Sequence, residues 1–206
     1  MKKLSTLFLS IILVGTANLA MSQAQLAVGL KGGLNFAKLD VDGSLSSNYE
    51  SKTGFHGGAF MLIKLSKIGI QPELLFSKQG STLKYSGTPT LESNFDYINV
   101  PVMLKLYTVA GINIQAGPQF GFVAKAKQDI PNLTGTGITT QDIKDQLKGY
   151  DLSVGLGLGW DAPFGLTIDA RYNLGLSKIN DISGSQATKN QVIQVSAGYK
   201  LFKFGK

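Results

Sequence analysis

The sequence predicts an all-β protein, an eight-stranded antiparallel up-and-down transmembrane β-barrel. Apolar and polar residues alternate in eight separate segments, and side chains that alternate in this way lie on opposite faces of a strand. Short connections between the segments alternate with long polar ones. The chain also has 25 glycines and no cysteine, which excludes disulfides, thiol chemistry and a lipoprotein anchor.

The first four segments lie at 26–37, 55–65, 68–79 and 98–106. The first places Leu, Val and Phe opposite Lys, Gly and Asn. The second is the least regular, because two large apolar residues fall on its otherwise polar face. The third and fourth set Ile, Leu, Val and Phe against Gln, Glu, Ser, Asn and Lys. Each is predicted to be a strand with one apolar and one polar face.

The last four segments lie at 112–125, 152–160, 166–177 and 193–201. The fifth alternates Ile, Ala and Phe with Asn, Gln and Gly. The sixth alternates Leu, Val and Trp with Ser and three glycines; these sit inside a strand with no helix after them, so close backbone packing is expected rather than a phosphate loop. The seventh is the most regular of the set, and the eighth sets Ile, Val, Ala, Tyr and Leu against Gln, Ser, Gly and Lys.

The connections predict how the barrel is oriented. Tight turns are expected at 65–69, 107–111 and 161–165, and long polar loops at 40–53, 86–94, 126–150 and 179–191. Outer-membrane barrels have short periplasmic turns and longer extracellular loops. An even number of strands places both ends of the barrel on the periplasmic side.

The N-terminus predicts export. Lys2 and Lys3 precede an apolar run at 7–14, and Ser22-Gln23-Ala24 fits a small-x-small cleavage site. Residues 1–24 are therefore predicted to be a signal peptide and residues 25–206 the barrel domain. The alternative, an N-terminal anchor, would need an apolar run of about 20 residues. The expected location is the cell outer membrane.

Alternation alone fits two opposite objects. A soluble lipocalin-like carrier would turn the apolar face inward around a hydrophobic ligand, and a membrane barrel would turn it outward to lipid. The polar face is rich in Gly, Asn, Gln and Ser, which favours the membrane barrel. Aromatic residues also fall near the strand ends, as in interfacial girdles, with Tyr172 expected in mid-strand as the exception. They are Phe36, Phe55, Phe76, Phe120, Phe122, Trp160 and Tyr199.

Several segments carry a family resemblance. They are GLKGGLNFAKL from Gly29, GIQPELLFSKQGS from Gly69, YINVPVMLKLY from Tyr97, AGPQFGF from Ala116, LGLGWDAPFGLTIDARYNLGLSKI from Leu156 and VSAGYKLF from Val195. Through them the chain resembles the PorT-like outer-membrane β-barrel family of bacteria that use type IX secretion. The resemblance implies an eight-stranded outer-membrane barrel that is inserted by the barrel insertion machinery. It implies no single activity, because most members have no assigned role.

The polar face places charged side chains in the predicted lumen. They are Lys31, Lys64, Glu73, Lys105, Lys125, Asp169, Arg171 and Lys200. Buried charges are costly unless they are paired, so we expect a salt-bridged plug near the periplasmic mouth. The excess of lysines over carboxylates leaves an anion site as the alternative.

The third long loop is where the sequence points for a partner. Thr139 can cap a short helix over 139–148 that Gly149 ends. Ile143 and Leu147 would form a small apolar face, with Asp142 beside it. Either this helix folds over the barrel mouth, or Asp142, Ile143 and Leu147 bind a partner.

Enzymatic activity is not predicted. His56 is the only histidine, so a multi-histidine metal site cannot form, and no catalytic, metal-binding or cofactor-binding residue is expected. The net charge of +7 comes without a Lys/Arg run, so nucleic acid is not an expected partner.

The predicted function is that of a non-enzymatic outer-membrane barrel with a structural or interaction role through its extracellular loops. Its expected partners are outer-membrane lipid, the insertion machinery and a protein at the loops. The alternatives are an accessory of type IX secretion, which rests on the resemblance, and the soluble carrier. Passive transport is disfavoured because side chains fill so small a barrel.

Overall fold

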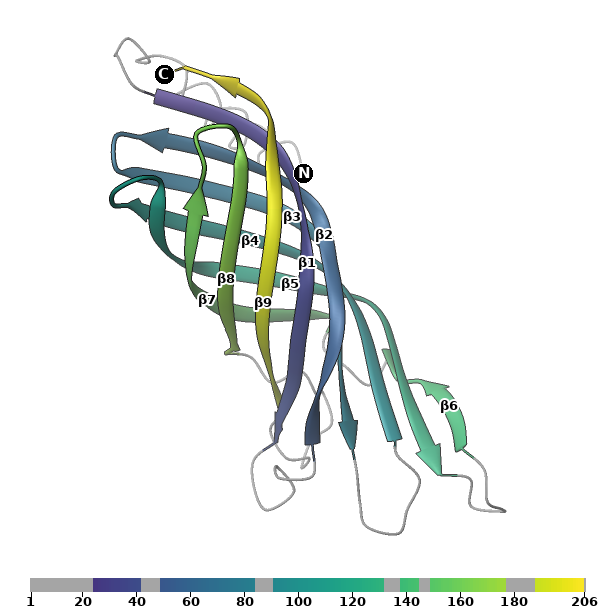
Figure 1. The fold of residues 1–206 in the computed structure, drawn as a ribbon. Coiled ribbons are helices and arrows are strands. Elements are labelled where there is room, and N and C mark those ends of the chain that lie inside the picture. Colours follow the sequence, from purple (N-terminus) through teal and green to yellow (C-terminus); the bar gives the residue numbers. More distant parts are fainter. Residues whose placement is uncertain are drawn as a thin grey trace, which may run out of the picture.

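The computed structural model describes residues 24–41, 49–83, 91–131, 138–144, 149–176 and 188–205. These residues form nine strands, which are β1 (Ala24–Val41), β2 (Tyr49–Leu65), β3 (Ile68–Leu83), β4 (Leu91–Tyr107), β5 (Ile112–Pro131), β6 (Ile138–Asp142), β7 (Tyr150–Asp161), β8 (Leu166–Gly175) and β9 (Thr188–Phe204). All pairings are antiparallel, and β1 pairs with β9 while β4 pairs with β5. Eight strands therefore close a barrel, with β6 as an appendage of β5 (Figure 1). The predicted fold class is confirmed.

Three tight turns join the strands at one end, which we call the turn end. They connect β2 to β3, β4 to β5 and β7 to β8. Gly111 has a φ of +83°, and a Cβ there would lie 2.1 Å from the carbonyl oxygen of Asp161, so only glycine fits. Leu26 near the start of β1 lies opposite Phe204 at the end of β9. Both strands thus meet the turn end, and the opposite end is called the loop end.

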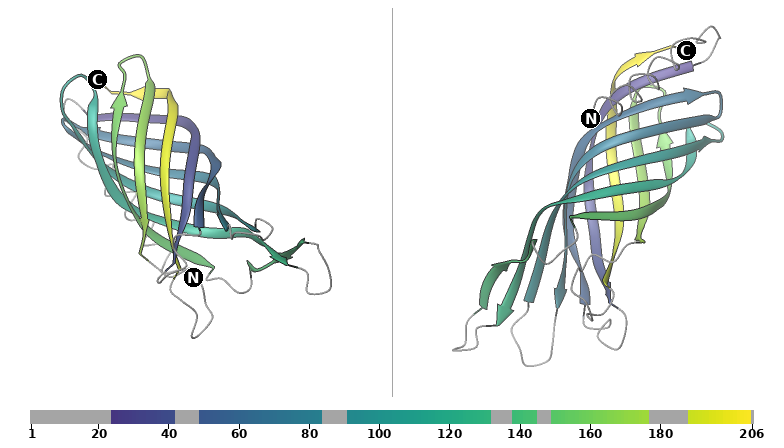
Figure 2. Two further views of the ribbon diagram at one scale, coloured as in Figure 1. Left: turned by 60° about the horizontal axis from the view of Figure 1, so that its bottom comes forward. Right: turned by 180° about the vertical axis from the view of Figure 1, so that it is seen from behind.

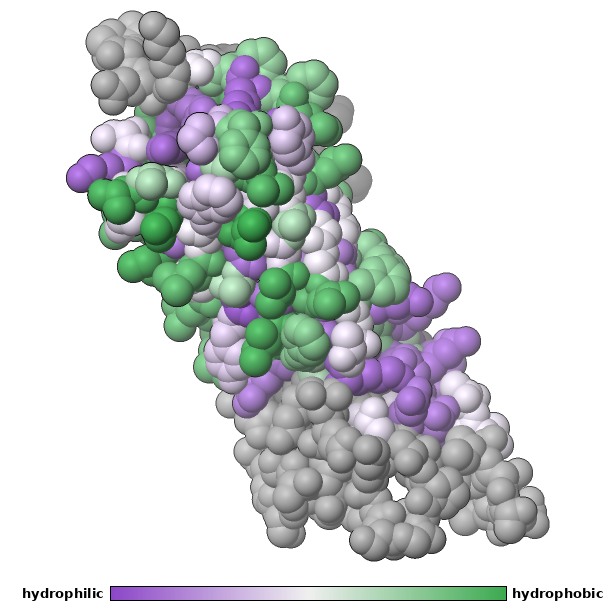
Figure 3. Space-filling model, viewed as in Figure 1, coloured by the Kyte–Doolittle hydropathy of each residue, from purple (hydrophilic) through white to green (hydrophobic). Residues whose placement is uncertain are grey.

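The apolar face of each strand points outward. Leu30, Leu74 and Leu158 are 55–62% exposed on the outer wall, whereas Asn35 and Gln194 are no more than 1% exposed inside the barrel. Figure 3 shows hydrophobic residues spread over the face of the wall that is seen in this view. The alternative of a soluble carrier is therefore wrong, because the interior is polar. No helix among the described residues is long and apolar enough to span a membrane.

Aromatic side chains border this apolar belt at both ends. Phe55 and Phe76 lie side by side at the loop end with ring centroids 6.4 Å apart, and Trp160 lies at the turn end, where its indole Nε1 donates to the carbonyl of Ala110 (3.0 Å). Tyr172 lies inside β8, as the seventh of its ten residues, and the outward apolar stripe continues beyond it to Leu174 and Leu176, so it stays the exception among the aromatic residues.

One wall of the barrel is taller than the other. Strand β5 has 20 residues, whereas β7 has 12 and β8 has 10, and β2 to β6 continue beyond the aromatic girdle (Figure 2). Side-chain contacts link this extension: Lys52 on β2 reaches across β3 to pair with Glu92 on β4 (2.5 Å), and the hydroxyl of Thr140 on β6 donates to Asp129 on β5 (2.8 Å). We call this extension of β2 to β6 beyond the aromatic girdle the polar wall. The long loops are therefore shorter than predicted, because the residues of this extension belong to strands.

A β-bulge corrects one predicted lumen residue. Tyr97 pairs with Val123, but Asp96 pairs with Lys125, so Ala124 is the extra residue. A bulge of one residue reverses which side chains face inward. Lys125 is consequently exposed on the outer wall, while Ala126 is fully buried. The prediction that Lys125 lies in the lumen is wrong for this reason.

The helix predicted over 139–148 is also wrong in its first turn. Residues 138–142 form β6, in which Thr139 pairs with Ile130 and Asp142 pairs with Lys127. The extended β5 offers these backbone groups a complete hydrogen-bonding edge, which replaces the helix start that Thr139 would have capped. Residues 145–148, including Leu147, lie outside the described part of the chain.

Candidate functional site

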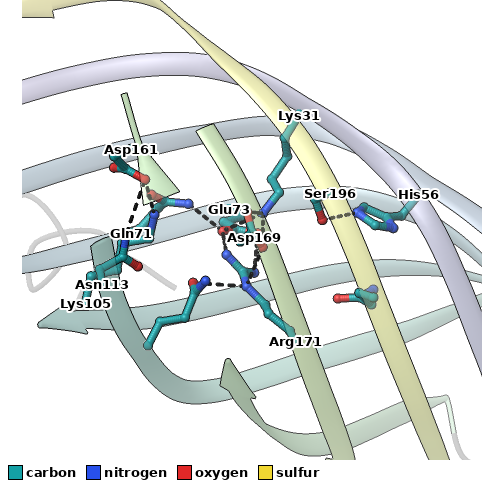
Figure 4. A network of polar contacts seen from close by, with 12 residues as sticks. Lys31, His56, Gln71, Glu73, Lys105, Asn113, Asp161, Asp169, Arg171 and Ser196 are labelled. Atoms are coloured by element: carbon teal, nitrogen blue, oxygen red, sulfur yellow. Dashed lines mark hydrogen bonds and ion pairs between the residues drawn. The ribbon is translucent and has the colours of Figure 1, made fainter. Parts of the chain in front are cut away.

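Four charged side chains meet in the middle of the lumen. We call Lys31 from β1, Glu73 from β3, and Asp169 and Arg171 from β8 the central quartet. The Arg171 Nη1 and Nη2 atoms donate to Glu73 Oε2 and Oε1 at 2.9 and 2.6 Å, and Arg171 Nε lies 3.0 Å from Asp169 Oδ1. Lys31 Nζ lies 2.9 Å from Asp169 Oδ2 and 3.5 Å from Glu73 Oε1 (Figure 4). Two cations thus face two carboxylates.

Neighbouring amides hold the central quartet in place. Gln71 Nε2 donates to Glu73 Oε1 at 2.7 Å, and Arg171 Nε donates to Gln115 Oε1 at 3.1 Å. All four charged side chains are no more than 2% exposed. Buried charges with this degree of pairing and hydrogen bonding are held rigidly, so the central quartet blocks the lumen at mid-height.

A second cluster forms at the turn end around Asp161, the last residue of β7. Lys105 Nζ donates to Asp161 Oδ1 (3.2 Å), and Lys200 Nζ and the Tyr107 hydroxyl donate to Oδ2 (2.9 and 2.8 Å). We call these residues the Asp161 cluster. Sequence reasoning assigned Asp161 to a turn and missed it. The inward parity of Ser153 and Asp161 along the same strand is the signal that could have identified it.

Lys64 belongs to neither cluster. Its ammonium lies 4.1 Å from the centroid of the Tyr107 ring, a cation–π contact, and no carboxylate among the described residues pairs with it. It lines a cavity of about 740 Å³ at the turn end together with Asp161, Lys200 and Lys203. The predicted charge cluster is therefore divided between two levels. The anion site stays a prediction, and this cavity is where the excess of lysines lies.

The single histidine lies in a buried relay inside the barrel. His56 Nε2 lies 2.8 Å from Ser196 Oγ, and Nδ1 lies 2.7 Å from Asn35 Oδ1. This order of side chains resembles a nucleophile, base and orienting group. All three are at most 3% exposed, and none lines a described cavity. No group of metal-ligating side chains is found among the described residues.

An apolar cluster lies on the inner face of β4 and β5 at the loop end. It consists of Phe95, Tyr97, Val123, Ala126 and Ile143. Ile143 is 7% exposed, and its amide donates to the carbonyl of Ala126 (3.0 Å), so this side chain packs into the barrel, while Asp142 is exposed.

Beneath this apolar cluster the remaining lumen is small. The space beside Tyr97, Asn99 and Gln119 measures about 10 Å³, room for about one water molecule. Three clusters of described side chains therefore occupy the lumen, and a cavity of about 740 Å³ opens at the turn end.

Residues 21–181 match the family described as outer membrane protein beta-barrel domain. The chain belongs to this family. Among solved structures, it is similar to Neisserial surface protein A, with 14% identity over 84% of this chain and 97% of that one and a TM-score of 0.54. It is also similar to Ail of Yersinia pestis, with 17% identity over 89% and 100% of the two chains and a TM-score of 0.50. These likenesses show the fold. No curated protein sequence matches the chain.

Outer-membrane barrels keep short turns in the periplasm and longer loops outside the cell. By this rule the turn end, with the Asp161 cluster and the cavity, is expected to face the periplasm. The loop end, with the polar wall and β6, is expected to face outward, so β2 to β6 carry the candidate sites for contact outside the cell.

Proposed function

We propose that the protein is a non-enzymatic, non-conducting outer-membrane barrel with a structural or interaction role through its polar wall. The observation that carries the proposal is the filled lumen. The central quartet, the Asp161 cluster and the apolar cluster occupy it at three levels. A barrel filled in this way has no aqueous channel, so its outer surfaces are what remains for function.

The polar wall supports an interaction role. It carries the exposed residues Thr139, Thr140 and Asp142 on a paired strand, and recognition residues are often held on such rigid scaffolds. Of the three residues predicted to bind a partner, Asp142 alone is described as exposed, because Ile143 packs inward. We therefore place the partner contact on the outer edge formed by β6.

Export and insertion complete the proposal. Residues 1–24 act as a signal peptide, and the barrel insertion machinery places residues 25–206 in the membrane. The PorT-like assignment and an accessory role in type IX secretion rest on the sequence resemblance alone. A deletion strain that still exports type IX cargo would remove that role.

The absence of cysteine makes single-cysteine labelling a direct test. A membrane-impermeant maleimide on intact cells is expected to label Asp142→Cys, and to label Lys67→Cys in the β2–β3 turn only after the outer membrane is permeabilised. The purified protein is expected to give no conductance steps in planar bilayers. Reversed labelling or stable channels would contradict the proposed orientation or the closed lumen.

The interaction role needs its own measurement. A photo-crosslinker attached through Asp142→Cys on intact cells is expected to give a discrete adduct. The matched control is Leu176→Cys, an exposed position at the low side of the same rim. Equal adducts at both positions, or none at Asp142→Cys in a correctly labelled barrel, would mean that the wall is not a contact surface.

A further inference from the structure

Three lysines form a patch on the outer wall just beyond the loop-end aromatic girdle. Lys78 follows Phe76 by two residues on β3, and Lys125 and Lys127 follow Phe122 on β5. All three are exposed. We call Lys78, Lys125 and Lys127 the lysine patch.

The strand register brings these lysines together. Asp96 on β4 lies directly opposite Lys78 on one side and Lys125 on the other, and Asn94 lies opposite Lys127. Neighbouring strands are about 4.8 Å apart, so Lys78 and Lys125 start about 10 Å from each other. The bulge at Ala124 is what turns Lys125 outward into this arrangement.

The lysine patch borders a hollow of about 320 Å³, which Asn94 and Asp96 also line. A group with several oxygen atoms can enter this hollow from the membrane interface that surrounds the barrel at this height. The long flexible stems of the lysines can bring their ammonium groups to a shared anion.

The charges of the lysine patch are not balanced within the described residues. None of the three ammonium groups has a described carboxylate within 4 Å. Lys52, on the same wall, is by contrast bound to Glu92 (2.5 Å) and Asn94 (2.8 Å). With Asp96 as the one carboxylate among the residues that line the hollow, the three lysines leave a net charge of +2. Such an arrangement attracts an anion.

The position of the lysine patch indicates which class of anion it can bind. The Lys78 ammonium lies 5.6 Å from the centroid of the Phe55 ring, so its stem runs along the apolar belt while its charge reaches the polar boundary. Below the patch the outward side chains are Phe76, Ile98 and Phe122, each 42–49% exposed. Figure 3 shows hydrophilic residues gathered next to the hydrophobic band on this side. An anion bound here is therefore adjacent to acyl chains.

We propose that the lysine patch binds the phosphate group of a phosphorylated lipid of the outer leaflet. The ammonium groups of Lys78 and Lys125 hold the phosphate, with Lys127 on its outer side, and the acyl chains lie against Phe76, Ile98 and Phe122. The proposal rests on the proposed orientation, in which the loop end lies outside the cell, and it adds a lipid site that does not depend on any protein partner of the wall.

Native mass spectrometry of the folded protein in a neutral detergent, titrated with phosphorylated lipid A, tests the site. The variant K78Q/K125Q/K127Q is expected to bind about a hundredfold more weakly, since one lysine near a membrane surface contributes about fivefold. The control K67Q/K144Q/K203Q removes the same number of charges from other exposed places and is expected to bind as the wild type. Arginines at the three patch positions should retain binding, and Asp96→Asn should tighten it severalfold.

Each remaining outcome has a defined meaning. Equal binding by wild type and K78Q/K125Q/K127Q, or equal binding of lipid A without phosphates, would overturn the proposal. Competition by millimolar inorganic phosphate would show a small-anion site instead of a lipid site. Loss of heparin binding without loss of lipid binding would assign the patch to a polyanionic glycan.

The failure of the lipid site is separable from failure of the proposed function. Heat-modifiable mobility on a gel and the labelling of Asp142→Cys on intact cells report the fold and its orientation. If both are normal in K78Q/K125Q/K127Q, then a change in lipid binding belongs to the lysine patch alone.

Discussion

Replacing Glu73 by Gln is expected to destabilise the barrel strongly while leaving its shape unchanged. The substitution is nearly isosteric, but it removes the negative charge of the carboxylate, which accepts hydrogen bonds from both terminal nitrogens of Arg171. Lys31 and Arg171 would then share Asp169 alone. One buried positive charge would be left without a counter-ion in a site that is no more than 2% exposed.

The size of the effect follows from this burial. Removing one partner from a buried ion pair costs about 3–5 kcal/mol, and the charge-assisted hydrogen bonds of Glu73 are part of that sum. With a guanidinium slope of about 4 kcal/mol per molar, the unfolding midpoint should fall by about 1 M. The double variant Lys31→Met/Glu73→Gln restores one cation facing one carboxylate, so most of the lost stability is expected to return.

The assay is the fraction of heat-modifiable protein on gels against guanidinium concentration, in lipid vesicles. A midpoint for Glu73→Gln within about 0.2 M of wild type, equivalent to under about 1 kcal/mol, would refute the reasoning. It would show that water or an ion compensates Arg171 without Glu73. A double variant as unstable as the single one would also refute it, because the loss would then not arise from charge imbalance.

Two further variants probe the wall itself in the same unfolding assay. Leu74→Arg, at a position 58% exposed in the apolar belt, is expected to cost about 2–4 kcal/mol, whereas Val109→Arg in the β4–β5 turn should cost at most about 1 kcal/mol; equal costs would contradict the outward apolar face. Gly33→Ala places a Cβ 2.0 Å from the carbonyl oxygen of Val195 and is expected to cost about 1–3 kcal/mol. Gly57→Ala is the control, with its nearest atom at 3.7 Å, and a loss as large as that of Gly33→Ala would show that strand propensity, not contact, decides.

The fold could be predicted because in a membrane barrel one face of each strand contacts lipid and is apolar, while the other face lines the lumen and is polar. Where the strands leave the membrane this alternation ends, and those parts of the strands were not predicted. Beyond the girdle the outer face of β4 and β5 is polar, as at Asn94 and Lys127, so residues 91–94 and 126–131 carry no regular alternation and were assigned to loops. The segment at Thr139 fits a capped helix by itself, and only the edge of β5 makes it a strand.

The candidate site could be predicted in its members more than in its pairing. Alternation alone identified Lys31, Glu73, Asp169 and Arg171 as inward-facing. It does not show which cation meets which carboxylate, because that depends on the relative heights of β1, β3 and β8 in the closed barrel. The bulge at Ala124 has no signature in composition, so Lys125 was assigned to the wrong side.

The seam between β1 and β9 has a consequence for the timing of assembly. Six of the eight seams of the barrel join strands that follow each other along the chain, and a seventh joins β5 to β7 past β6, whereas this seam pairs Leu26 with Phe204. The chain between two such positions must be brought together at an entropic cost before their contacts form. The other seams can therefore form one after another along the chain, but the barrel closes only when β9, the last strand, pairs with β1. Until then, two open edges need protection from wrong pairing.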